Sequence, residues 1–136
     1  MVEQEVISFL SELHVGILSI PRQDRAPHST PVWYQYESDN TIWFLADPNS
    51  QKGKLLSVGS KLSFVVQSED PPYKYVSIEG SVASVAPYDI ESDLRPIARF
   101  YLGEEGGDEY VSQSGETTGN RYTIEINKLM SYGVES

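Results

Sequence analysis

The chain has 136 residues, a formal net charge of −10 and no cysteine. An acidic chain lacks the basic face that nucleic-acid binding needs, and without cysteine it has neither a disulfide framework nor a thiolate metal site. No apolar run is long enough to span a membrane, and the acidic start of the chain differs from a signal peptide. We therefore expect one cytoplasmic domain over residues 1–136, with no metal, nucleic acid or membrane as partner.

The first part of the chain predicts one helix and two strands. Residues 3–13 place apolar side chains at helical spacing. His14–Ile20 is expected to form a strand that ends at a proline, and Ser29–Tyr36 a second strand. Pro31 lacks a backbone donor, so it predicts an edge, a bulge or a ligand-facing position within that second strand.

A strand, a short helix and another strand are predicted over residues 41–67. The sequence Asp-Pro-Asn at 47–49 ends the first strand, because proline lacks a donor and Asx side chains favour turns. Ser50 occupies the expected N-cap of the helix, and Gly59 the expected C′ position. Residues 62–66 alternate between apolar and more polar side chains, as strands do.

The second half predicts two more strands, at 73–86 and 121–127. Gly80 inside the first of them indicates a bulge or the close approach of another backbone. The expected total is six strands, mostly in antiparallel hairpins, with two or three helices. Short consecutive strands favour a closed barrel, because closure removes exposed edges.

Between these two strands we expect a helix over 89–102 with Asp93 as its N-cap, so that the following proline falls in the first turn. Residues 103–119 are rich in glycine and glutamate, and they predict a mobile loop or a short helix around Glu109.

The start of the central helix carries the clearest chemical signal. Residues 50–53, Ser-Gln-Lys-Gly, would place free N–H groups, a hydroxyl and an ammonium together, which suits a phosphate. Gly53 would allow a ligand close to the backbone. Lys52, Lys54 and Lys61 fall within ten positions without an acid between them. The alternative interpretation is a serine that only caps a surface helix whose lysines are solvated.

No self-contained catalytic set is present. Neither histidine belongs to a metal-binding motif, and no nucleophile elbow or nucleotide-binding glycine pattern occurs. If the protein is an enzyme, a bound cofactor supplies its chemistry. The candidate proton donors are His28, Tyr75 and Glu79, and the catalytic residues stay unassigned.

Three motifs together resemble those of the pyridoxamine phosphate oxidase-like superfamily. Residues 50–56, SQKGKLL, are similar to the S-R-K-G-K-x-L stretch that grips the FMN phosphate in the oxidases. Residues 75–80, YVSIEG, resemble their V-R-V-E-G strand, and residues 27–34, PHSTPVWY, resemble the P-x-x-x-P-V-W-F strand of the wider superfamily. The order and spacing of the motifs agree over roughly residues 5–133.

The resemblance implies a mainly β fold, a six-stranded antiparallel split β-barrel of FMN-binding type. It also implies a homodimer with FMN or the deazaflavin F-420 at the subunit interface. The resemblance further implies that Lys52 pairs with the phosphate and that Tyr75 replaces a cofactor-contacting glutamine. An aromatic face that includes Trp33 and Tyr36 is expected to be covered in the dimer. The implied cofactor-binding residues are Thr30, Pro31, Val32, Trp33, Ser50, Gln51, Lys52 and Tyr75.

Two departures from the oxidases narrow the expected function. Gln51 stands where the oxidases have arginine, and the chain lacks their C-terminal arginine and histidine segment. We therefore expect no vitamin B6 chemistry and a closer likeness to actinobacterial members that use F-420, FMN or haem. The expected activity is an oxidoreductase that moves a hydride between FMN or F-420 and a small conjugated substrate. The alternatives are a non-catalytic protein that stores or senses FMN, F-420 or haem, and a barrel that contacts only other proteins.

Overall fold

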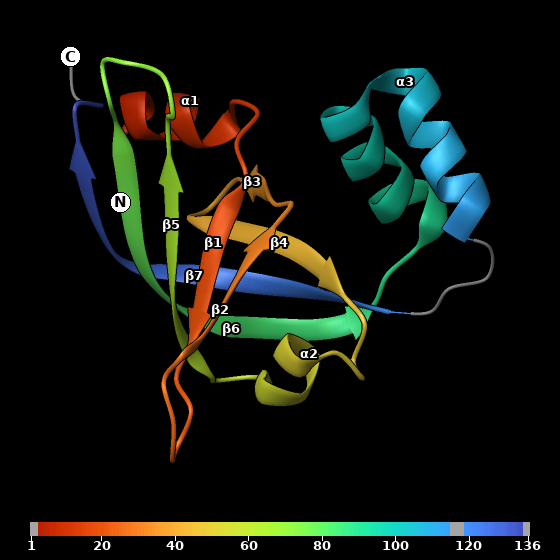
Figure 1. Ribbon diagram of the computed structural model, residues 1–136, viewed down its shortest axis with the longest axis horizontal. Helices are drawn as coiled ribbons and strands as arrows, with labels where there is room; N and C mark the ends of the chain where they lie inside the picture. The colour runs from red at the N-terminus through yellow and green to blue at the C-terminus, as the bar shows by residue number, and fades with distance from the viewer. Residues whose placement is uncertain (1–2, 115–118, 135–136) are drawn as a thin grey trace.

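The computed structural model describes residues 3–114 and 119–134, and its central element is one antiparallel sheet of seven strands in the order β2-β1-β5-β6-β7-β4-β3 (Figure 1). The strands are β1 (Gly16–Ile20), β2 (His28–Val32), β3 (Gln35–Glu37), β4 (Thr41–Ala46), β5 (Lys61–Gln67), β6 (Tyr75–Pro87) and β7 (Asn120–Tyr132). The helical segments are α1 (Gln4–Ser11), α2 (Gln51–Leu55), the π-helical turn η1 (Ile90–Leu94) and α3 (Arg95–Ser114). The expected class, a mainly β split barrel with a few helices, is confirmed.

The number of strands and the closure of the barrel differ from the prediction. The single strand expected over Ser29–Tyr36 is two strands, β2 and β3, and these are the two outer strands of the sheet. The sheet therefore stays open between them. Pro31 lies on the outer strand β2, where it pairs with Ile17 of β1, so the edge position expected from its missing donor is correct.

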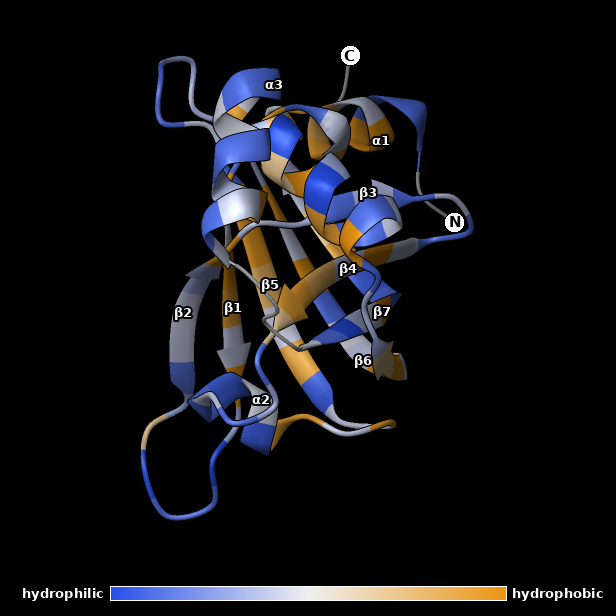
Figure 2. Ribbon diagram, turned by 90° about the vertical axis from the view of Figure 1, so that its right-hand side faces the viewer, coloured by the Kyte–Doolittle hydropathy of each residue, from blue (hydrophilic) through white to orange (hydrophobic). Residues whose placement is uncertain are grey.

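The core lies inside the curled sheet and is covered at one end by α1 (Figures 1 and 2). Alternate residues of β5 are buried and exposed, as its pattern predicts. Gly80 lies at a register shift between β6 and β7, and a Cβ there would come within 2.8 Å of the Glu125 carbonyl oxygen. The expected bulge and close approach are both confirmed. The largest fully buried side chains are Tyr34, Tyr122, Phe44, Phe64, Leu10, Leu18, Ile20, Ile42, Ile78, Ile97, Ile124 and Val66.

Helix α2 begins as predicted and ends earlier than predicted. The Ser50 hydroxyl accepts a hydrogen bond from the Gly53 N–H at 3.1 Å, so Ser50 is the N-cap. The helix ends at Leu55, and Gly59 lies in the turn before β5 rather than at the C′ position. The close approach at Gly53 is made by the chain itself, because a Cβ there would collide with the carbonyl oxygen of Asp47.

The segment after β6 is more helical than predicted. Asp89 is the N-cap, since its carboxylate accepts from the Ser92 N–H at 2.8 Å. The assignment of Asp93 as N-cap is wrong. Helical structure continues to Ser114 across a break at Gly103, whose φ of 82° suits glycine. The segment after this break is a second helical arm as far as Ser114, so of the two predictions for residues 103–119 the helix around Glu109 is correct and the loop is not. Residues 115–118 lie outside the described residues.

Asp93 has a structural role instead. Its side chain is buried and lies 2.9 Å from Nη1 of Arg121, whose Nη2 contacts Glu37 at 2.9 Å. The Arg121 guanidinium also lies 4.2 Å from the Trp43 ring centroid. These contacts join η1 to β3, β4 and β7. They fix the start of α3 beside the sheet, where a second small core of Leu94, Ala98 and Val111 packs against Trp33 and Leu45.

In the described ranges, 3–114 and 119–134, no helix is both long enough and apolar enough to cross a bilayer.

Candidate functional site

A cavity of about 270 Å³ lies where β2, β4, α2 and α3 meet. It brings together predicted cofactor-binding residues from two separate motifs. Pro31, Val32 and Trp33 come from one motif, and Lys52 comes from the other. Structural elements that the motifs did not identify supply the remaining walls. The lining residues are Pro31, Val32, Trp33, Leu45, Lys52, Leu94, Ile97 and Tyr110.

The walls of this cavity are aromatic and aliphatic. Trp33 stacks on Tyr101 with centroids 5.0 Å apart and an interplanar angle of 6°. Tyr110 approaches Trp33 at 5.3 Å with a tilt of 50°. Lys52, which is half-buried, is the only charged side chain among the lining residues. This arrangement suits a flat aromatic ligand that carries an anionic group.

An arginine reaches the start of α2 from a distant loop. Nη1 of Arg22 donates to the Gln51 side-chain oxygen at 2.5 Å, and its Nε donates to the Ala26 carbonyl at 2.7 Å. Gln51 therefore holds a guanidinium next to the position where the related motif has its own arginine. This contact could not be predicted from local sequence, because Arg22 lies 29 residues before Gln51 in a polar turn.

The charge of Arg22 is not neutralised by a neighbour. Arg95, Arg99 and Arg121 each form ion pairs with carboxylates. Among the described residues, Arg22 bonds only to neutral oxygen atoms. The start of α2 therefore carries uncompensated positive charge on an otherwise acidic chain, which favours an anionic ligand.

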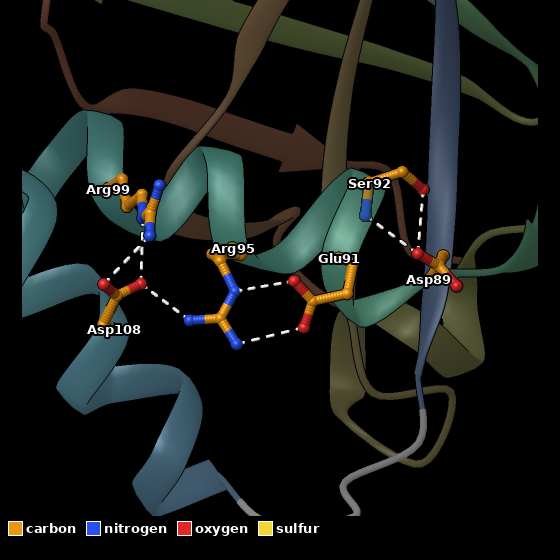
Figure 3. Close-up of polar contacts among 6 residues, drawn as sticks. All are labelled: Asp89, Glu91, Ser92, Arg95, Arg99 and Asp108. Atoms are coloured by element: carbon orange, nitrogen blue, oxygen red, sulfur yellow. Dashed lines mark hydrogen bonds and ion pairs between the residues drawn. The ribbon is translucent and has the colours of Figure 1, made fainter.

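Ion pairs hold the two arms of α3 together (Figure 3). The second arm carries Tyr110. Arg95 Nη1 lies 2.6 Å from an Asp108 oxygen, and Arg99 Nε lies 2.8 Å from the same atom. Hydrogen bonds from Arg99 and Arg95 hold the pKa of Asp108 below its usual range. Arg95 also lowers the pKa of Glu91 through a two-point contact at 2.9 and 3.0 Å.

The other predicted cofactor residues lie outside the cavity lining. Thr30 is half-buried on β2 opposite Leu18. Ser50 serves as the helix cap, and its hydroxyl also donates to the Asp47 carbonyl at 2.6 Å. Tyr75 lies at the start of β6 with its ring stacked on Tyr132 at 5.8 Å. Within one chain, the structure therefore does not bring Tyr75 to the cavity of Lys52.

The three candidate proton donors are also elsewhere. His28 begins β2 opposite Ile20. Glu79 lines a different cavity of about 390 Å³ together with Ser19, Lys61 and Gly80. Tyr110 places a hydroxyl-bearing side chain at the Lys52 cavity. In the described ranges, no three His, Cys, Asp or Glu side chains gather as a metal site would require.

Sequence reasoning missed several residues that line the cavity. Leu94 and Ile97 belong to the helix predicted over 89–102, but nothing local indicated what the apolar side chains of that helix cover. Tyr110 lay in a segment predicted as a loop or a short helix, and nothing local indicated that this segment covers the cavity. Leu45 belongs to a predicted strand, and its outward position became visible only with the sheet.

Comparison with known proteins agrees with this architecture. The model of the pyridoxamine 5'-phosphate oxidase family matches residues 2–127. A conserved hypothetical protein from Mycobacterium tuberculosis has a similar structure, with a TM-score of 0.70 and 23% identity over 97% of this chain and 84% of that chain. An F-420 reductase has a TM-score of 0.64 and 19% identity, over 95% of this chain and 98% of that chain.

A FAD-binding protein from Mesorhizobium loti has a TM-score of 0.65 and 18% identity, over 96% of this chain and 92% of that chain. No curated protein matches the chain. The similarity to these solved structures concerns the fold alone, whereas the family model covers nearly the whole sequence. The chain belongs to the pyridoxamine 5'-phosphate oxidase family.

Proposed function

We propose that the chain binds FMN or the deazaflavin F-420 in the Lys52 cavity and acts as an oxidoreductase on a small, flat, conjugated substrate. The observation that carries this proposal is the meeting of Lys52 with Pro31, Val32 and Trp33 in one cavity. Membership of a family that contains flavin-dependent oxidoreductases supports it. So do structural relatives described as an F-420 reductase and a FAD-binding protein.

The residues of the cavity fit such a cofactor. The ring system would lie against Pro31, Val32 and Trp33, and the phosphate would lie toward Lys52 and Arg22. When bound, the ring supplies the hydride chemistry that the side chains cannot provide. Leu94, together with the other apolar residues of α3, would exclude water from the ring, and the cations would fix its orientation.

A second copy of the chain is part of the proposal, because one chain does not bring all of the predicted cofactor-binding residues to one cavity. The volume of the Lys52 cavity, about 270 Å³, also falls just below the usual range of about 300–1,000 Å³ for ligand pockets. Pro31, Ile17, Val65 and Ser77 form one row across four strands. Ser77 therefore lies about 14 Å from Pro31 across the sheet, and Tyr75 is two residues beyond it. Tyr75 would thus reach the cofactor only from a second copy.

The outer face of the sheet offers a surface for that copy. Met130 is 59% exposed, Tyr132 62%, and Ile17 and Tyr75 39% each. Met130 continues the row of Ile17 and Val65. A contiguous apolar surface of this kind is typical of an interface, and a symmetric dimer would cover it on both copies.

A non-catalytic protein that stores or senses FMN, F-420 or haem is the second candidate. The position of two predicted proton donors favours it, because neither His28 nor Glu79 lines the Lys52 cavity. This observation bears on catalysis and leaves cofactor binding unaffected.

The decisive experiment is mass spectrometry of the ligand released from native protein, followed by turnover assays with the reduced cofactor. FMN or F-420 in the released fraction, with oxidation of the reduced cofactor by conjugated acceptors, supports the oxidoreductase. The same ligand without turnover supports storage or sensing. Haem, or no ligand together with no binding of added FMN or F-420, contradicts the proposed cofactor.

A further inference from the structure

The open edge of the sheet is bridged by only two residues, Trp33 and Tyr34. They separate the end of β2 at Val32 from the start of β3 at Gln35. β2 and β3 are the two outer strands of the sheet. Tyr34 lies between them in the chain and belongs to neither strand ladder, because the pairing of β2 ends at Val32 and that of β3 begins at Gln35. Backbone groups that are shielded from water need partners, and here the partner comes from α3.

The Tyr101 hydroxyl lies at this open edge and bonds to the backbone of both Tyr34 and His14. It accepts from the Tyr34 N–H at 3.0 Å and lies 2.6 Å from the His14 carbonyl and 3.0 Å from the Tyr34 carbonyl. A phenol has one proton, and the shorter distance assigns it to His14. Burial raises the pKa of Tyr101, so the hydroxyl stays protonated at neutral pH. One side chain thus joins the segments before β1 and before β3.

The ring of Tyr101 supports the neighbouring Trp33. The two rings are nearly parallel and in stacking contact, as described above. Phe100 packs edge-on against Tyr101 at 5.3 Å. The Tyr101 hydroxyl therefore fixes the backbone next to Trp33, while the Tyr101 ring fixes the Trp33 side chain. Tyr101 itself is not a lining residue of the Lys52 cavity.

We infer that Tyr101 is a positioning residue that holds Trp33 in place as a wall of the Lys52 cavity and thereby sets the affinity for the ring of the ligand. The effect on the ligand rests on the proposed function. The effect on Trp33 does not, since it follows from contacts within the chain.

Removing one hydroxyl tests the inference. Tyr101→Phe keeps the ring, and Tyr34→Phe is the matched control, because the Tyr34 hydroxyl bonds to the Leu10 carbonyl at 2.8 Å in the core. A Trp43→Phe background leaves Trp33 as the only tryptophan, since the chain has two. Tyr101→Phe is expected to increase acrylamide quenching of Trp33 and to weaken FMN and F-420 binding by about tenfold. Tyr34→Phe is expected to lower the urea midpoint and to leave quenching and affinity unchanged.

The outcomes separate this inference from the proposed function. Unchanged Trp33 quenching in Tyr101→Phe overturns the inference, and so does an equal loss of affinity in both variants, which would indicate a general loss of stability. If the parent binds neither cofactor, the proposed function fails, and quenching measured without ligand still tests whether Tyr101 positions Trp33.

Hydrogen exchange at the Tyr34 amide tests the same contact in the unmodified chain. Slow exchange is expected, and exchange as fast as at the exposed Asp24 would also overturn the inference.

Discussion

Among the residues that the structure describes, Lys52 is the only charged one that lines the cavity, and its replacement by alanine removes that charge. A hydrogen bond to a charged group contributes about 1.5–3 kcal/mol, which corresponds to roughly ten- to a hundredfold in affinity. Lys52 is half-buried, and Arg22 leaves a second cation nearby, so we expect a loss near the lower end, about tenfold. Lys52→Glu should lose more, because it adds repulsion toward the phosphate.

The assay compares FMN with riboflavin, which has the same ring and no phosphate. Isothermal titration is expected to show that Lys52→Ala weakens FMN binding and leaves riboflavin binding almost unchanged. The difference between the two ligands isolates the interaction of Lys52 with the phosphate, as in a double-mutant cycle. F-420 should respond as FMN does, since it also carries a phosphate on a ribityl chain.

Lys54 provides the matched control, because it is exposed on the same short helix and is not among the lining residues. Lys54→Ala should change neither affinity nor stability beyond about 0.5 kcal/mol, as is usual for surface substitutions. Equal affinities of the parent and Lys52→Ala for both FMN and F-420 would refute the reasoning and place the phosphate site elsewhere.

Three further changes test other parts of the account. Arg22→Ala is expected to weaken FMN binding by about tenfold, while Arg25→Ala in the same exposed loop should not; equal titration curves for both would remove Arg22 from the site. The lowered pKa of Asp108, caused by Arg99 and Arg95, stabilises the fold above the usual carboxyl pKa, and this contribution is lost as the pH falls through the lowered value. Below about pH 4, the free energy of unfolding measured with urea should therefore fall more for the parent than for Asp108→Asn, and identical pH profiles would contradict this. Met130→Glu on the outer face is expected to convert a dimer into a monomer by light scattering, and a monomeric parent at micromolar concentration would contradict the dimer.

Features that depend on neighbours in the sequence could be predicted. The Ser50 cap needs only a hydroxyl three residues before a helical N–H. The irregularity at Gly80 follows from one residue without a side chain in an otherwise regular strand. In both cases the interaction partners lie close in the chain or in the adjacent strand, and the residue types leave few alternatives.

Features that depend on distant segments could not be predicted. Val32, Trp33 and Tyr34 form a continuous apolar run without a turn residue, so nothing local indicated that the chain passes from one edge of the sheet to the other there. The second arm of α3 contains glycines that disfavour a helix, and Asp108 stabilises it through arginines on the first arm. The contact between Arg22 and Gln51 likewise exists only in the folded chain.

Crystal structures of the chain with FMN and with F-420 would locate the ligand directly. We expect a phosphate oxygen at hydrogen-bonding distance from Nζ of Lys52, about 2.7–3.2 Å, with the ring against Pro31, Val32 and Trp33. A second copy of the chain is expected to close the site. Ligand density away from Lys52, or a ring that does not touch Trp33 or its neighbours on β2, would show that the cofactor does not bind in this cavity.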